Sequence, residues 1–159
     1  MTAMNHSTKQ NKAATYLSAI IQHKCPRCRT GNIFESHNPY ALREGKYMKM
    51  HQHCPVCDQP TEIEVGFYYG TGYVSYALCV AFTVMFFGLW YLLFGFNIYD
   101  NRIFWCMGAD IAMLVMLQPV LMRTSRVIWL SWFVGYHPNW RSEKAAAPER
   151  TNPDQGGNW

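Results

Sequence analysis

The feature that most constrains this chain is a run of 35 residues, positions 65–99, that contains no Asp, Glu, Lys or Arg. About 20 apolar residues are enough for a helix to cross the hydrocarbon core of a bilayer. A second apolar stretch at 103–122 follows a short polar turn, and only Asp110 and the pair Gln118-Pro119 interrupt it. The sequence therefore predicts an α-helical membrane protein with a two-span transmembrane hairpin over residues 67–122.

The positive charges predict how this hairpin is oriented. Of the 14 Lys and Arg residues, eight precede Val65, five follow Met122, and Arg102 alone lies between the apolar stretches. Because Lys and Arg accumulate on the cytoplasmic side of membrane helices, we expect both termini in the cytoplasm. The bilayer is the expected partner. Nucleic acid is not, since the basic residues are scattered and form no clustered basic face.

Two Cys-x-x-Cys pairs precede the hairpin, and they predict a metal site. Cys25 and Cys28 form the first pair, and Cys54 and Cys57 form the second after 25 intervening residues. Each pair delivers two sulfurs to one ion, so two pairs complete a tetrahedral shell for structural Zn²⁺. Residues 23–64 are rich in turn-forming residues and too few to build a large core, so metal binding would supply much of their stability. We interpret them as a zinc-ribbon-like knuckle module.

Three other interpretations of the cysteines stay open, namely disulfides, iron and a dithiol redox site. Disulfides require an oxidising compartment, which conflicts with a cytoplasmic module. A redox pair rarely has a second pair beside it, and a shell of four sulfurs leaves no open position for catalysis. His23, His51 and His53 flank the pairs. We interpret them as solvated residues, with metal ligation as the alternative.

Shorter segments flank the module and the hairpin. Residues 1–22 are polar and end in a short amphipathic helix at 13–22, whose apolar face would rest on lipid headgroups or on the module. Residues 123–140 are expected to form an interfacial amphipathic helix, ended by His137 and Pro138, because aromatic residues recur at helical spacing. This aromatic stripe consists of Trp129, Trp132, Phe133 and Tyr136. Residues 141–159 are expected to form a flexible tail.

Asp110 needs a physical reason, because a carboxylate in hydrocarbon costs several kcal/mol and is usually paired, protonated or functional. Antiparallel packing of the two spans would bring it near residues 88–91, where the Tyr91 hydroxyl is a candidate partner. Proton or ion handling is the alternative. Cys79 and Cys106 are expected to act as small apolar residues. Small residues that would let another helix approach the first span follow one side of it, at Gly66, Gly70, Ala77 and Ala81.

Several segments resemble the bacterial family catalogued as domain of unknown function 983, especially its Bacteroidetes forms. The likeness covers most of residues 24–136. It rests on Lys24 to Cys28 followed by Gly31 and Phe34, on His53 to Cys57, on Glu64 to Gly70, on Tyr73 to Ala77, and on Arg123 to Arg126 with Trp129. The chain departs from the family pattern at Arg29 and Asp58, which stand where glycine would follow each knuckle.

The resemblance implies a small inner-membrane protein with a cytoplasmic zinc-binding module and two spans. The family has no established activity, although some relatives are encoded beside cytochrome oxidase assembly components. Our expectation is an accessory or assembly factor of a membrane complex, such as a respiratory one. The alternatives are a zinc- or redox-responsive regulator and a membrane enzyme or transporter using Asp110. An enzyme is not expected, because the chain has no Gly-rich phosphate loop, nucleophile elbow or His-Glu-x-x-His motif, and no small-molecule substrate is identified.

Overall fold

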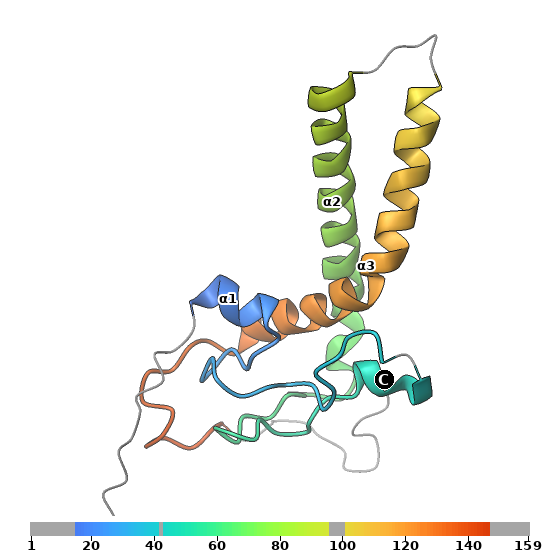
Figure 1. Cartoon of the computed structure of the whole chain (residues 1–159). Helices are drawn as coiled ribbons and strands as arrows, with labels where there is room; N and C mark the ends of the chain where they lie inside the picture. The colour runs from blue at the N-terminus through green and yellow to red at the C-terminus, as the bar shows by residue number, and fades with distance from the viewer. Residues whose placement is uncertain (1–14, 42, 96–100, 147–159) are drawn as a thin grey trace, which may run out of the picture.

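The computed structural model describes residues 15–41, 43–95 and 101–146, which form a helical hairpin rising from a loop-rich base (Figure 1). Residues 13–14 of the first expected helix, most of the interhelical turn and residues 147–159 lie outside this part. The described helices are α1 (Tyr16–Ile21), the 3₁₀ helices η1 (Arg43–Met48) and η2 (Phe67–Gly70), α2 (Thr71–Phe94) and α3 (Arg102–Phe133). Between residues 24 and 60, the β structure of the described chain consists of isolated β-bridges, without a strand.

Two helices are long and apolar enough to cross a membrane, as expected. They cover Phe67–Phe94, which joins η2 to α2, and Arg102–Phe133. The most apolar stretch of each is almost entirely unburied within the molecule, unlike the core helix of a water-soluble domain. The first begins at Phe67, where the predicted hairpin begins. α2 ends at Phe94 and is followed by Gly95, whose φ of 64° combined with ψ of 169° is adopted readily only by glycine.

α3 differs from the expected pair of separate helices, a span to Met122 followed by an interfacial helix over 123–140. It is one continuous helix that includes Pro119. Figure 1 shows that it changes direction, so that its second half crosses beneath the hairpin. Proline lacks an N–H and its ring clashes with the preceding turn, which bends a helix without ending it. The expected end at His137 and Pro138 is wrong, because α3 ends at Phe133 and Val134 is extended and buried.

The core lies between the second half of α3 and the cysteine-containing loops. Buried residues follow one face of α3 at intervals of three or four residues, namely Arg123, Val127, Leu130 and Val134. Ile33, Phe34, Met50 and the four knuckle cysteines belong to the same cluster. The second half of α3 is therefore the platform on which the loops fold.

Some rings of the aromatic stripe pack against η2, whereas others are exposed on the surface. Trp129 donates its indole N–H to the Phe67 carbonyl at 2.8 Å, and the rings of Phe67 and Phe133 have centroids 5.1 Å apart. These contacts join α3 to η2, whereas Trp132 stays 63% exposed. The expectation that all four rings face the membrane interface therefore fails for Trp129, which is used to fix the start of α2.

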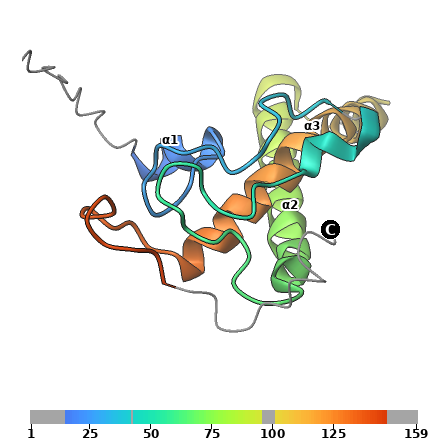
Figure 2. The ribbon, with the colours of Figure 1, turned by 90° about the horizontal axis from the view of Figure 1, so that it is seen from below.

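α1 lies beside the second half of α3, and Figure 2 shows the two side by side from below. Its last turn is closed by two hydrogen bonds, from Lys24 N to Ala19 O at 2.8 Å and from His23 N to Ile20 O at 3.0 Å. This is a Schellman arrangement with His23, at φ 55°, in the position that glycine usually occupies. Ala19 and Ile20 are buried, so α1 packs by this face onto the rest of the base.

Candidate metal centre

The four cysteines of the two knuckles converge on one point, as their spacing predicts. The Sγ atoms of Cys25 and Cys57 are 3.7 Å apart, and those of Cys28 and Cys54 are 3.8 Å apart. All four sulfurs lie within 4.8 Å of one another. A tetrahedral ion with metal–sulfur bonds of 2.3 Å requires sulfur–sulfur edges of about 3.8 Å. The donor set therefore fits a tetrahedral metal ion.

The two knuckles have the same local structure. In each, the residue after the second cysteine donates its N–H to the carbonyl of the first, from Arg29 to Cys25 at 2.8 Å and from Asp58 to Cys54 at 2.9 Å. Arg29 and Asp58 have φ values of 56° and 55°. These are the positions where the resembled family has glycine, and the left-handed backbone explains that preference. The absence of glycine has not prevented either turn from forming.

The site is closed and contains sulfur alone. The four cysteine residues are between 0% and 8% exposed, so no face of the tetrahedron opens to solvent. Among the described residues, no histidine or carboxylate joins the group. His23 instead lies 3.3 Å from the Thr124 hydroxyl and packs edge-on against Phe34. Burial, followed by the charge of Arg123, lowers the pKa of His23 to about 4, so this residue is neutral and structural rather than solvated.

The thiols are arranged so that a cation is needed to ionise them all. Hydrogen bonds from the thiols of Cys25, Cys54 and Cys57 lower the pKa of Cys28, because they stabilise its thiolate. Hydrogen bonding to Cys28, then to Cys54 and Cys57, raises the pKa of Cys25. Negative charge on one sulfur therefore keeps a neighbour protonated. A divalent metal ion reverses this by stabilising four thiolates at once.

Gly31 is packed directly against the site. Its N–H points at Cys28 Sγ at 3.4 Å, and a Cβ at this position would collide with Cys54 Sγ and approach Val56 at 3.2 Å. We predict that Gly31→Ala displaces a ligand sulfur and weakens metal binding by about 10- to 100-fold, the range found when supporting contacts are lost. Competition with a chelator measures this. Gly135→Ala is the matched control because its Cβ meets nothing within 4 Å, and equal affinities in the two variants would contradict the prediction.

Arg123 attaches the module to α3. Arg123 is only 1% exposed. Its guanidinium donates to three backbone carbonyls, those of Tyr47 at 2.6 Å, Ser36 at 2.9 Å and Asn38 at 3.2 Å. The same group lies 4.7 Å from the centre of the Phe34 ring. Three carbonyl dipoles and a ring face thus stabilise the buried positive charge. The loop between the two knuckles is consequently fixed to the helix.

Two further contacts join the module to the helices. Arg126, one turn after Arg123, donates to the Met48 carbonyl at 3.2 Å. The buried Tyr68 hydroxyl, in η2, donates to the Thr61 carbonyl at 2.5 Å. The module is therefore packed on the base of the hairpin, not attached by a flexible linker. The sequence indicated Arg123 and Arg126 only as positive charges and as part of the family resemblance, and their spacing of three residues on an amphipathic helix was the available signal for a structural role.

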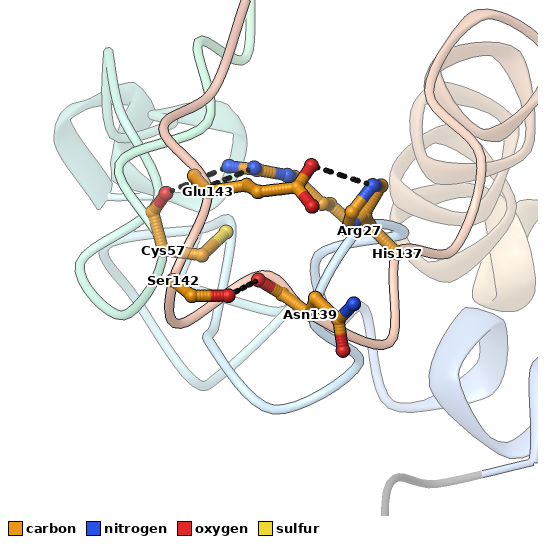
Figure 3. Close-up of polar contacts among 6 residues, drawn as sticks. All are labelled: Arg27, Cys57, His137, Asn139, Ser142 and Glu143. Carbon is orange, nitrogen blue, oxygen red and sulfur yellow. Dashed lines mark hydrogen bonds and ion pairs between the residues drawn. The ribbon is translucent and has the colours of Figure 1, made fainter.

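Residues 137–143, which follow α3, contact both knuckles and are called the clasp here (Figure 3). Arg27, inside the first knuckle, donates to the Cys57 carbonyl at 3.2 Å and to the Glu143 carbonyl at 2.7 Å. His137 donates its backbone N–H to the Arg27 carbonyl at 3.1 Å, and its ring lies 3.2 Å from the Glu143 carboxylate. Arg27 therefore joins both knuckles to the clasp. The flexible tail was expected from residue 141, but residues 141–143 belong to the clasp.

The bend in α3 is also covered by the module. The Tyr40 hydroxyl donates to the Met116 carbonyl at 3.0 Å, one turn before Pro119. A proline kink opens backbone carbonyls of the preceding turn, and a side chain from another segment commonly satisfies them. Pro119 leaves the Val115 carbonyl without its helical N–H, and Tyr40 binds the next carbonyl of the same turn, that of Met116.

Asp110 lies between the two long helices, but its expected partner is wrong. The Thr83 hydroxyl, not that of Tyr91, donates to Asp110 Oδ2 at 3.1 Å. Asp110 is 6% exposed, and its Oδ1 has no hydrogen-bond partner in the described part of the chain. Cys106, one turn earlier, is fully buried. The helices therefore pair in a different register from the one expected.

Of the small residues expected along the first span, Gly70, which ends η2, makes a close contact with α3. A Cβ on Gly70 would collide with the Trp129 ring, so glycine at this position lets α2 and α3 meet. Ala77 and Ala81 are exposed, and their side of α2 faces away from α3.

No protein-family profile, no curated protein and no solved structure matches this chain. The resemblance to the family of unknown function 983 stays a prediction.

Proposed function

We propose that the chain is a small bacterial inner-membrane protein that holds a structural Zn²⁺ and acts as an accessory or assembly factor of a membrane complex. The observation that carries this proposal is the closed shell of four buried sulfurs. Catalytic zinc sites keep a ligand position open for water or substrate, whereas closed four-sulfur sites stabilise folds. The metal thus supports a rigid surface at the base of the hairpin.

Zinc is proposed because a shell of four thiolates in tetrahedral geometry suits it and because structural sites of this kind need no redox chemistry. Cys25, Cys28, Cys54 and Cys57 would each supply one thiolate. The ion would supply the charge that lets all four stay deprotonated. Elemental analysis of protein purified without added metal is expected to give one zinc per chain. Iron in its place, with a visible thiolate-to-iron absorption, would contradict the assignment.

Membrane insertion is supported by the two long apolar helices and by aromatic residues at their base. Tyr69, Tyr73 and Tyr76 recur at i, i+4 and i+7 and are the most exposed tyrosines at the start of the first helix. Tyrosines favour the headgroup level, because the ring is apolar and the hydroxyl stays hydrated. Arg123 and Arg126 lie beside the module, since both donate to backbone carbonyls of the loop between the knuckles. This supports a cytoplasmic module with both termini on that side.

Co-purification from native membranes in mild detergent tests the accessory role. We expect a stoichiometric membrane complex to be recovered with the tagged protein and lost with Cys28→Ser, which disrupts the module but leaves the hairpin sequence intact. Cys79→Ser, a change in α2 outside the metal centre, is the matched control. Normal assembly of every major inner-membrane complex in a strain lacking the protein would contradict the proposal.

A metal- or redox-responsive regulator is the second candidate, and the Arg27 contacts favour it. Because Arg27 binds the second knuckle at Cys57 O and the clasp at Glu143 O, displacement of that knuckle would release residues 137–143. Treatment with peroxide or a mild chelator is expected to expose the clasp to protease under this candidate. An unchanged cleavage pattern with altered metal content would exclude it.

The variant Asp110→Asn distinguishes these two candidates from a third hypothesis, a membrane enzyme or transporter that uses the charge of Asp110. The substitution removes the charge but keeps the size of the side chain and an oxygen that can accept from Thr83. For an accessory factor we predict unchanged complex assembly and unchanged abundance of the protein, with less than about 1 kcal/mol lost in stability, because the hydrogen bond is retained. Assembly of the complex in a deletion strain carrying the variant measures this. Loss of function at normal abundance would indicate that the charge is used.

A further inference from the structure

α1 presents an apolar face that nothing in the described part of the chain covers. Leu17 and Ile21, one helical turn apart, are 67% and 72% exposed. The neighbouring residues Ala19 and Ile20 are buried against the base, so only part of the helix surface is covered. A helix of six residues has little stability in isolation, so its attachment to the base sets where this face lies.

Side-chain contacts attach α1 to the segment of α3 that follows its bend. The hydroxyls of Tyr16 and Ser131 are hydrogen-bonded at 3.0 Å, and the His23 ring meets the Thr124 hydroxyl at 3.3 Å. Figure 1 shows α1 at the level where the hairpin leaves the base, and the knuckle loops lie farther from the hairpin, below α1. α1 therefore lies at the depth at which the membrane would begin.

We propose that Leu17 and Ile21 of α1 insert into the surface of the lipid bilayer and anchor the metal module against it. This inference rests on the proposed membrane insertion of the hairpin. Apolar side chains on one face of a surface helix gain free energy by leaving water for the boundary between headgroups and acyl chains. Trp132, exposed on the same half of α3 to which α1 is attached, is the ring type that favours this depth. The base thus contacts the membrane at two points, α1 and the part of α3 that follows its bend.

Lipid photo-crosslinking in native membrane vesicles tests the anchor. A benzophenone amino acid is placed at Leu17 or at Ile21 in the full chain, and the illuminated protein is weighed by mass spectrometry. Leu92, 80% exposed in α2, is the reference for lipid contact, and Val56 in the second knuckle is the reference for water. We expect phospholipid adducts at positions 17, 21 and 92, and at least tenfold less adduct at position 56.

The controls separate failure of the anchor from failure of the membrane proposal. Lipid adducts at position 92 but not at 17 and 21 would overturn the anchor and leave the spanning hairpin intact. A protein adduct at 17 or 21 would overturn it too, because a partner would then cover the face. Absence of lipid adducts at position 92 would overturn both proposals. Equal metal content in all four labelled proteins confirms that the module is folded in each.

Discussion

Cys28→Ser is expected to abolish stable metal binding and to unfold the module around residues 23–64. Cys28 is fully buried, hydrogen bonds from the other three thiols lower the pKa of its own thiol, and the Gly31 N–H points at its sulfur. Metal binding contributes about 10–16 kcal/mol to the folding of small structural zinc domains at neutral pH. A site with three sulfurs loses a large part of this energy, and few apolar contacts remain to replace it.

Metal content per chain and limited proteolysis in detergent measure both effects. We expect less than about one tenth of the metal to remain after dialysis against a chelator, and rapid cleavage between residues 29 and 53, because folding of small zinc domains depends on the metal. The variant should still fractionate with membranes, since the hairpin does not contain the site. Cys79→Ser, in α2, should retain both metal and protease resistance. Retained metal with unchanged cleavage in Cys28→Ser would show that the four-cysteine site is wrong.

Arg123→Ala is expected to detach the loop between the knuckles from α3 and to lower the free energy of unfolding by about 3–5 kcal/mol, because three backbone carbonyls lose their donor and a cavity replaces the buried side chain. The carbonyls belong to Ser36, Asn38 and Tyr47. Lysine cannot restore the contacts, because a single ammonium group lacks the planar fork of guanidinium. Arg123→Lys is therefore also expected to destabilise the base. Arg141→Ala, at an exposed position, is the matched control.

Hydrogen exchange and the titration of His23 report this change independently. Amides of residues 33–51 are expected to exchange faster in Arg123→Ala, whereas those of α2 keep their protection. The pKa of His23, about 4 in the intact protein, should rise because the second cause of its depression is the charge of Arg123. It should stay below 6.5, since burial is the larger cause. Unchanged exchange together with an unchanged pKa would show that Arg123 does not hold the loop.

Local patterns predicted the parts of the fold that depend on short stretches of chain. The uncharged run predicted the first long helix, and the two cysteine pairs predicted the cluster of sulfurs, because each pair constrains its own turn. The same local reasoning divided residues 103–122 from a separate helix at 123–140, whereas α3 is one helix through Phe133 that contains Pro119. Whether a proline ends or bends a helix depends also on contacts that other segments make near the kink, and Tyr40, which binds the Met116 carbonyl there, comes from 76 positions away.

The pairing register of the two long helices is a second feature that short sequence patterns did not predict. Asp110 was expected beside Tyr91 and is hydrogen-bonded to Thr83, two turns away along α2. Two apolar helices offer many similar pairings, and the register is selected where they meet at the base, by Gly70 against Trp129 and by Phe67 against Phe133. These contacts join residues about 60 positions apart, as the indole hydrogen bond from Trp129 to Phe67 illustrates. No local pattern contains that information.

The sequence by itself determined that the chain has two long apolar helices and a group of four sulfurs, because helix length, hydrophobicity and the geometry of a Cys-x-x-Cys turn are properties of contiguous residues. Only the tertiary structure decided that α3 is one bent helix, that Arg123 is buried beneath the loop, and that Arg27 connects the knuckles to the clasp. Buried hydrogen bonds to backbone carbonyls have no sequence signature on the acceptor side, since every residue carries the same acceptor. The position of such an arginine is therefore fixed by the packing that surrounds it.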